Sequence, residues 1–115
     1  MLNKIVLIGR LVRDVELRHT QQGTAVANFT LAVDRPFLSN GEKEADFIDI
    51  VTWRKQAEVC ANYLGKGRLV AVEGRLQIRS YDDQNGVRRK VAEVVADQVV
   101  FLDKPPELEY DDVPF

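Results

Sequence analysis

The chain has 115 residues, 45% of them hydrophobic, which suits one compact domain with a single core and is too short for two. Its apolar runs, such as Ile5–Ile8, are far shorter than the roughly 20 residues of a membrane span. Arg10 and Arg13 interrupt the first apolar stretch, so no secretory signal is expected and the protein should be cytoplasmic. Cys60 is the single cysteine, which excludes an internal disulfide and a paired-cysteine metal or redox site.

The net charge of -2 hides an uneven distribution along the chain. All 16 lysine and arginine residues lie at or before Lys104, whereas four of the 18 acidic residues follow it. Residues 1–104 are therefore mildly basic, and residues 105–115 form an acidic tail that we expect to be disordered, because it begins with two prolines and offers little apolar area. This division leaves room for a polyanionic partner that the total charge alone would disfavour.

The first predicted strand covers residues 4–12. Ile5 and Leu7 fall on one side of it and Val6 and Ile8 on the other, so both faces are apolar. Cover for both faces must come from the curvature of a barrel near Gly9 or from another subunit. We expect at least a dimer, since a monomer would leave half of this strand in contact with water.

Alternation of apolar and polar residues predicts a half-buried strand over residues 25–33 and a further strand over residues 46–53. Residues 55–64 carry apolar side chains at i, i+3, i+4 and i+7, which predicts a helix with one buried stripe. Gly65 and Gly67 are expected to end that helix.

Residues 69–81 and 87–102 read as a hairpin, with Asn85-Gly86 as its turn. The order is thus three strands, one helix and two strands, with bends expected at Gly9 and Gly74. This order suits a mainly β fold, the five-stranded Greek-key barrel of the OB type, with its helix between the third and fourth strands. Periodicity alone also allows another small α+β sheet.

One face of the predicted sheet combines aromatic and basic side chains. Phe47, Trp53 and Tyr81 share the outward phase of their strands with Arg75 and Arg79. Stacking on such rings contributes about 1 to 3 kcal/mol per base and tolerates any sequence, while the cations follow the phosphates. The alternative is that the rings are core or interface and the charges a solvated face, and for the set as a whole this is the weaker interpretation.

Two further positions have an ambiguous role. Phe37 lies in the predicted loop of residues 35–45, close to Arg35, so its ring either packs onto the core or clamps a base. Asp49 falls among the predicted base-contacting residues, where an acid should repel phosphate. Pairing of Asp49 with a neighbouring arginine is the one arrangement that we expect to accommodate it.

Catalytic patterns are lacking in the sequence. His19 is the only histidine, no phosphate-binding glycine motif is present, and Ser39 and Ser80 have no nearby base. The adjacent Asp82 and Asp83 allow a metal-dependent nuclease as an alternative, although neighbouring acids in a turn more often cap backbone amides. We expect no catalytic residue, no metal and no cofactor.

The chain resembles the bacterial-type single-stranded DNA-binding proteins, an OB-fold family, over nearly the whole predicted barrel. The matching segments are Asn3–Leu11, Gly23–Phe29, Asp46–Ile48, Trp53–Glu58, Tyr63-Leu64, Lys66-Gly67, Val72–Leu76 and Glu93–Ala96. The resemblance implies base stacking at Phe37, Phe47, Trp53 and Tyr81 and assembly as a homotetramer. It also implies sequence-independent binding and protection of single-stranded DNA during replication, recombination and repair.

Together, the residues and the resemblance predict a domain over residues 1–104 and a flexible acidic tail over residues 105–115. The predicted DNA-binding residues are Arg35, Phe37, Phe47, Trp53, Arg54, Lys55, Arg75, Arg79, Tyr81 and Arg88. The tip of the tail resembles the acidic tip with which the family docks replication and repair proteins, and its residues are Asp111, Asp112, Val113, Pro114 and Phe115. An OB-fold RNA binder remains an alternative.

Overall fold

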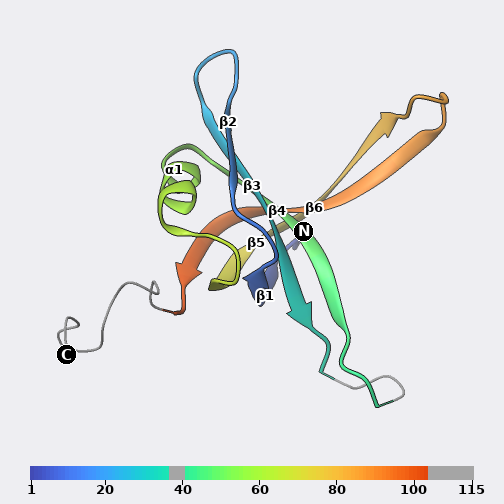
Figure 1. Ribbon diagram of the computed structural model, residues 1–115. Helices are drawn as coiled ribbons and strands as arrows, with labels where there is room; N and C mark the ends of the chain where they lie inside the picture. The colour runs from blue at the N-terminus through green and yellow to red at the C-terminus, as the bar shows by residue number, and fades with distance from the viewer. Residues whose placement is uncertain (37–40, 104–115) are drawn as a thin grey trace.

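The structure is a computed structural model that describes residues 1–36 and 41–103, so Phe37 and the acidic tail lie outside the described residues. In chain order the elements are β1 (Ile5–Leu11), β2 (Glu16–His19), β3 (Ala25–Asp34), β4 (Ala45–Trp53), α1 (Arg54–Tyr63), β5 (Leu69–Asp82) and β6 (Arg88–Phe101) (Figure 1). All the predicted strands and the predicted helix are present, with ends close to those expected.

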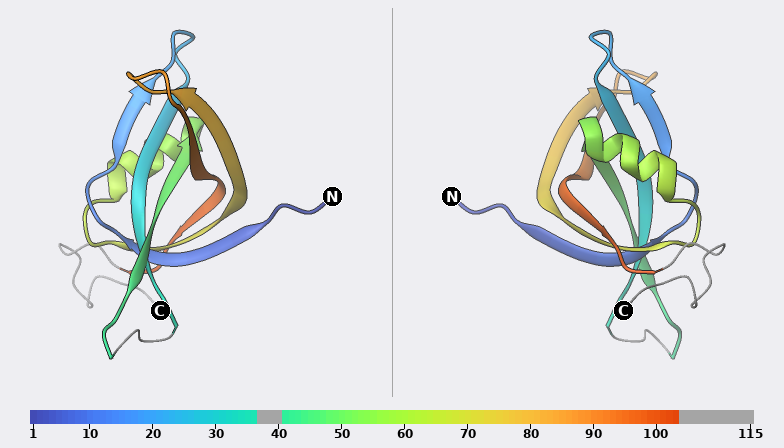
Figure 2. Two further views of the ribbon diagram at one scale, coloured as in Figure 1. Left: turned by 90° about the vertical axis from the view of Figure 1, so that its right-hand side faces the viewer. Right: turned by 90° about the vertical axis from the view of Figure 1, so that its left-hand side faces the viewer.

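Five of these strands close into a barrel, whose curved walls are visible in Figure 2. The pairs β1–β5, β5–β6, β3–β4 and β1–β3 are antiparallel. A short parallel pair between β4 and β6 closes the ring, with Ile50 opposite Val94 and Val51 opposite Val95. The predicted mainly β barrel of the OB type, with one helix between its third and fourth strands, is confirmed.

Strand β2 was not predicted from the sequence. All four residues of this strand are exposed, so they lack the alternation of buried and exposed side chains that marks the other strands. Strand β2 pairs only with β3, where Arg18 lies opposite Val26, and it lengthens that strand into a projecting hairpin. Figure 1 shows this hairpin and the outer half of the β5–β6 hairpin extending away from the barrel as two separate arms.

The two glycines at the predicted bends lie where strands approach too closely for a side chain. A Cβ atom on Gly9 would lie 2.5 Å from the carbonyl oxygen of Ala32, at the crossing of β1 and β3. A Cβ atom on Gly74 would lie 2.1 Å from the carbonyl oxygen of Val95, and a β-bulge falls between Glu73 and Gly74. Both of these close approaches between strands therefore depend on glycine.

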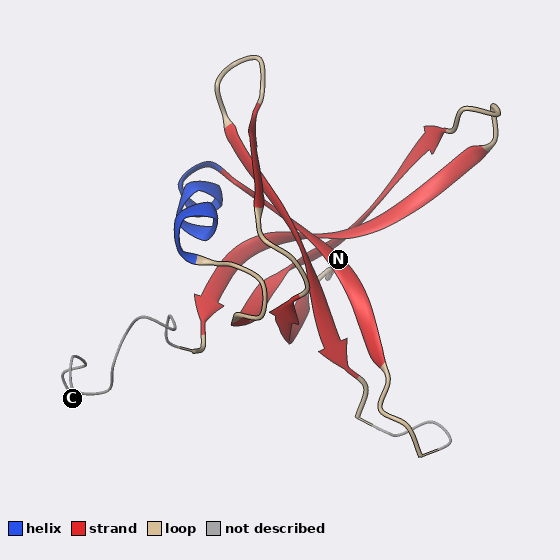
Figure 3. Ribbon diagram, viewed as in Figure 1, coloured by secondary structure: helices blue, strands red, loops and turns tan. Residues whose placement is uncertain are grey.

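The single helix lies on one side of the strands (Figure 3) and contributes its apolar stripe to the core. Ala57, Cys60 and Leu64 are buried, and Cys60 and Leu64 pack with barrel residues such as Ile50 and Val72. Burial raises the pKa of the Cys60 thiol to about 11, so this side chain serves as a small core residue and not as a nucleophile. Within residues 1–36 and 41–103, no helix is long and apolar enough to cross a membrane.

Candidate nucleic-acid interface

The outer side of β3, β4, β6 and β5 forms one continuous face. Residues directly opposite one another in paired strands point to the same side of a sheet. Trp53 pairs with Val26, Val51 lies opposite Val95, and Val95 lies opposite Arg75. Strand pairing thus places Trp53 and Arg75 on the same outer face, although they are distant in the sequence.

Trp53 ends β4 at an abrupt change of direction. Its side chain is 41% exposed, and the next residue, Arg54, has a φ of 62° and begins α1. The left-handed conformation costs a residue with a Cβ atom about 1 to 2 kcal/mol. This turn brings Arg54 and Lys55 to the rim of the hollow that Trp53 lines.

Three adjoining hollows run along this face, and we call them together the groove. The first has a volume of about 730 Å³ and lies beside Trp53, Arg54, Lys55 and Arg75. The second, of about 420 Å³, continues past Trp53 toward the β2–β3 arm. The third, of about 280 Å³, is lined in part by residues of that arm. Glu93 lines all three hollows, so the groove passes between the two arms with this residue at its centre.

The cations of the groove differ in how far they are neutralised. Arg79 Nε lies 3.2 Å from a carboxylate oxygen of Glu93, and Arg75 lies 4.0 Å from Asp97. By contrast Arg18 and Arg13 donate to neutral acceptors, the Asn28 side chain at 3.0 Å and the Thr30 hydroxyl at 3.2 Å. Among the described residues no carboxylate lies within 4.0 Å of the cationic groups of Arg13, Arg18, Arg54 and Lys55, which leaves these four charges available to phosphate.

Asp49 is held by a hydroxyl and not by a direct ion pair. Thr30 donates its hydroxyl hydrogen to Asp49 at 2.9 Å, and Arg13 in turn donates to the Thr30 oxygen. Within the described part of the chain, no arginine or lysine nitrogen lies within 4.0 Å of Asp49, so the expected pairing with an arginine is not formed and Thr30 links the carboxylate to Arg13 instead. This chain of hydrogen bonds accommodates an acid on the outer face.

Five of the predicted DNA-binding residues come together in the groove: Trp53, Arg54, Lys55, Arg75 and Arg79. Tyr81 shares their face farther out on the β5–β6 arm, where it lies opposite Arg89. Phe47 is 69% exposed at the other end of β4, beside a fourth hollow that Ile5, Leu76 and Glu93 also line.

Two further predicted residues, Arg88 and Arg35, are paired with carboxylates elsewhere in the structure. Arg88 lies opposite Asp82, on the other face of the arm from Tyr81, and is 3.7 Å from that carboxylate. Arg35 pairs with Glu44 at 2.9 Å and with Asp46 at 2.8 Å, and its hydrogen bond lowers the pKa of Asp46. Phe37 lies outside the described residues. A contribution of these residues to binding stays a prediction.

Several residues that line the groove were not predicted from the sequence to bind DNA: Arg13, Arg18, Asn28, Gln77 and Glu93. Gln77 has the same period-two phase as Arg75 and Arg79, so that signal was present. Arg18 lies on the unpredicted β2, and Glu93 comes into place only through the pairing of β6 with β5 and β4.

The acidic pair at the tip of the β5–β6 arm supports a turn. Asp83 accepts hydrogen bonds from the backbone N–H groups of Val87 and Asn85, both at 2.9 Å, and from Arg89 Nε at 2.9 Å. The Val87 amide, the Arg89 side chain and the Asn85 amide lower the pKa of Asp83. Its carboxylate therefore caps the hairpin, and the residues described contain no cluster of three potential metal ligands.

Sequence comparison identifies the family and the known proteins that this chain resembles. Residues 2–102 match the Single-strand binding protein family. The chain is 62% identical over 104 residues to a single-stranded DNA-binding protein of Halalkalibacterium halodurans, covering 90% of this chain and 62% of that protein. It is 59% identical over 104 residues to single-stranded DNA-binding protein A of Bacillus subtilis, covering 90% of this chain and 60% of that protein. It is 54% identical over 115 residues to single-stranded DNA-binding protein 2 of Clostridium acetobutylicum, covering 99% of this chain and 86% of that protein.

Proposed function

The chain belongs to the Single-strand binding protein family, and from that premise we propose that it binds and protects single-stranded DNA without requiring a particular sequence. The family is one of DNA-binding proteins and not of enzymes. Two of the relatives, from Halalkalibacterium halodurans and Bacillus subtilis, are considerably longer, so this chain spans about 62% and 60% of their lengths. We therefore infer its activity, substrate and partners from the residues of this chain.

The observation that carries the proposal is the groove, which joins an exposed indole to arginine and lysine side chains that no carboxylate of residues 1–36 and 41–103 neutralises. A flat ring such as that of Trp53 accepts any base by stacking, at about 1 to 3 kcal/mol per base. Lys55, Arg54 and Arg18 lie along the same hollows, where they can follow a phosphate backbone. Neither interaction reads base identity, which supports binding that tolerates sequence.

Trp53 provides a direct test, because it is the only tryptophan in the chain. Titration with oligo(dT) should quench its fluorescence and saturate, whereas a duplex of the same length should give little change at the same salt concentration. Oligo(U) of equal length separates a DNA binder from an RNA binder. Absence of saturable quenching by oligo(dT) would refute the proposal, and tighter binding of oligo(U) would favour the RNA alternative.

We propose further that the protein acts as a homotetramer. Val6 and Ile8 of β1 are more than half exposed. Ile8 lies opposite Ala71 of β5, and Ala71 lies opposite Val100 of β6, so the exposed side chain of Val100 lies on the same outer side. In the described structure, the Val6–Gly9 part of β1 pairs only with β5, which leaves its other edge open to a strand from a second copy. The number four comes from the family resemblance.

For the rest of the chain we propose two regions with different tasks. Residues 1–104 would bind DNA and assemble, and residues 105–115 would recruit replication and repair proteins through Asp111, Asp112, Val113, Pro114 and Phe115. The four acids after Lys104 and the aromatic Phe115 suit a partner pocket that is apolar and edged by basic residues. Such a protein would act in replication, recombination and repair, on DNA in the cytoplasm.

A further inference from the structure

Glu93 is a buried carboxylate at the centre of the groove, where its negative charge would repel the phosphates of a bound polyanion. It lies on β6 and is 9% exposed. Its Oε1 atom accepts a hydrogen bond from Arg79 Nε at 3.2 Å. Among the described residues no donor forms a hydrogen bond with its Oε2 atom, so this oxygen can accept a hydrogen bond from a ligand.

The second hollow of the groove offers Glu93 surroundings that suit a nucleobase. Val26 and Val51 are buried side chains on the same outer face, and Trp53 adds an aromatic surface. Asn28 and Gln77 add polar groups to a space of about 420 Å³. Apolar and aromatic walls with a few polar groups are typical of sites that hold a flat organic ligand.

The negative charge of Glu93 selects which part of a nucleotide can enter. A phosphate would meet a carboxylate and be repelled, whereas an uncharged base can present an N–H group to it. An ionised carboxylate is an acceptor only. Cytosine carries an N4 amino group at the position where thymine carries the O4 acceptor, and acidic side chains pair with that amino group.

We propose that Glu93 Oε2 accepts a hydrogen bond from the exocyclic amino group of a base in the second hollow, so that this hollow favours cytosine over thymine. The inference rests on the proposed function and deepens it. Stacking and phosphate contacts remain indifferent to sequence, and Glu93 adds a preference for one base at one position of the bound strand.

The first test uses the unaltered protein and a modified base. Oligonucleotides of deoxycytidine are compared with equally long ones in which 2-pyrimidinone replaces cytosine, because 2-pyrimidinone lacks only the N4 amino group. Binding of the modified strand should be weaker by about fivefold or more, the lower end of the discrimination expected of a good base contact. Equal affinities would overturn the proposal.

The second test compares Glu93→Gln with Glu58→Gln, which removes the same charge from an exposed position on α1 outside the groove. A glutamine can donate to thymine O4, so Glu93→Gln should raise the ratio of the dissociation constants for oligo(dC) and oligo(dT) by about fivefold or more. Glu58→Gln should leave that ratio unchanged.

The outcomes separate this inference from the function on which it rests. If Glu93→Gln changes both dissociation constants by the same factor, the carboxylate only positions Arg79 and the base preference is wrong. If the unaltered protein binds neither homopolymer, the proposed function itself is wrong. Should the variant fail to fold, as circular dichroism would show, the comparison with 2-pyrimidinone decides alone.

Discussion

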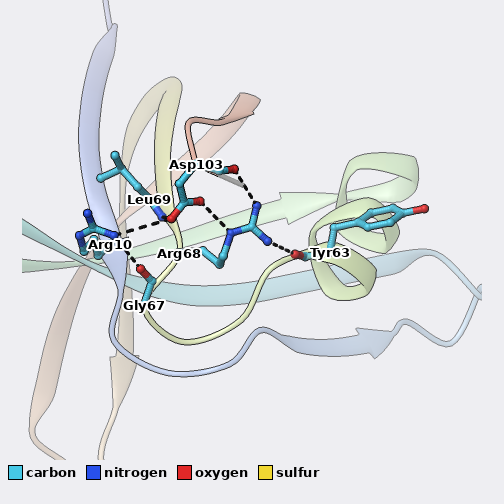
Figure 4. A network of polar contacts seen from close by, with 6 residues as sticks. All are labelled: Arg10, Tyr63, Gly67, Arg68, Leu69 and Asp103. Carbon is cyan, nitrogen blue, oxygen red and sulfur yellow. Dashed lines mark hydrogen bonds and ion pairs between the residues drawn. The ribbon is translucent and has the colours of Figure 1, made fainter. Parts of the chain in front are cut away.

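The guanidinium group of Arg68 holds the carboxyl end of β6 to the end of α1. Its Nε atom lies 2.7 Å from Asp103 Oδ1, and its Nη1 atom donates to the carbonyl oxygen of Tyr63 at 2.7 Å (Figure 4). Arg68 is 8% exposed, and the second Asp103 oxygen accepts the backbone N–H of Leu69 at 3.1 Å. Asp103 is the last residue described, so this contact fixes the end of the described chain next to the end of α1.

Loss of the Arg68 side chain should destabilise the domain. Arg68→Ala removes hydrogen bonds from a charged group, each worth about 1.5 to 3 kcal/mol, and leaves their partly buried acceptors without that donor. Urea denaturation at a fixed protomer concentration should show a free energy of unfolding lower by at least that amount. Arg88→Ala is the control, because its ion pair with Asp82 is longer and exposed and should change stability by less than about 1 kcal/mol. Equal effects of the two substitutions would contradict this account.

Ionisation of Asp103 should make the free energy of unfolding depend on pH in the acidic range. Burial alone would raise its pKa, but the hydrogen bonds from Arg68 and the Leu69 amide, with the nearby Arg68 and Arg10 charges, hold the pKa below the ordinary value of 3.8. A lowered pKa in the folded state stabilises the protein above the unfolded pKa, and this contribution is lost as pH falls through the folded pKa. The difference in unfolding free energy between the native chain and Asp103→Asn should therefore shrink as pH falls below about 4. A constant difference would refute the prediction.

The aromatic side chains of the outer face should each contribute to DNA binding. Replacement of Trp53, Tyr81 or Phe47 by alanine should weaken binding of oligo(dT) by about 1 to 3 kcal/mol, because a stacking platform is lost. Fluorescence anisotropy of a labelled strand measures all three variants. Tyr63→Ala is a matched control, since that side chain is exposed on α1 away from the groove. Unchanged affinity in all three variants would remove these rings from the interface.

Charge on the outer face of β1 should disrupt assembly. Val6→Glu or Ile8→Glu would bury a carboxylate in the proposed subunit contact, so light scattering at micromolar concentration should show a smaller mass than the two or four times 13.1 kDa expected of the native chain. Val87→Glu, at the exposed hairpin tip, should leave the mass unchanged. A monomeric native chain would exclude the assembly outright.

Removal of residues 111–115 should separate DNA binding from recruitment. The truncated protein should bind oligo(dT) as well as the full chain, or slightly better at low salt, because acidic residues compete with phosphate over about 10 Å. It should lose the replication and repair proteins that the full chain captures from a bacterial lysate. A scrambled tip of the same composition keeps the charge and should also lose them. Capture of the same proteins by the truncated chain would show that the tip is not the docking element.

The sequence by itself determined the five barrel strands, the helix and the outward phase of Trp53, Arg75 and Arg79, because the alternation of side chains within one strand is a local property. It did not reveal β2, whose four exposed residues are held by backbone pairing with β3 and carry no apolar pattern. Only the tertiary structure decided which outward residues share a groove, since that depends on register between distant strands. The pairing of β6 with β4 and β5 placed Glu93 beside Trp53 and Arg79, and the pairing of the β5–β6 arm placed Arg88 on the opposite face.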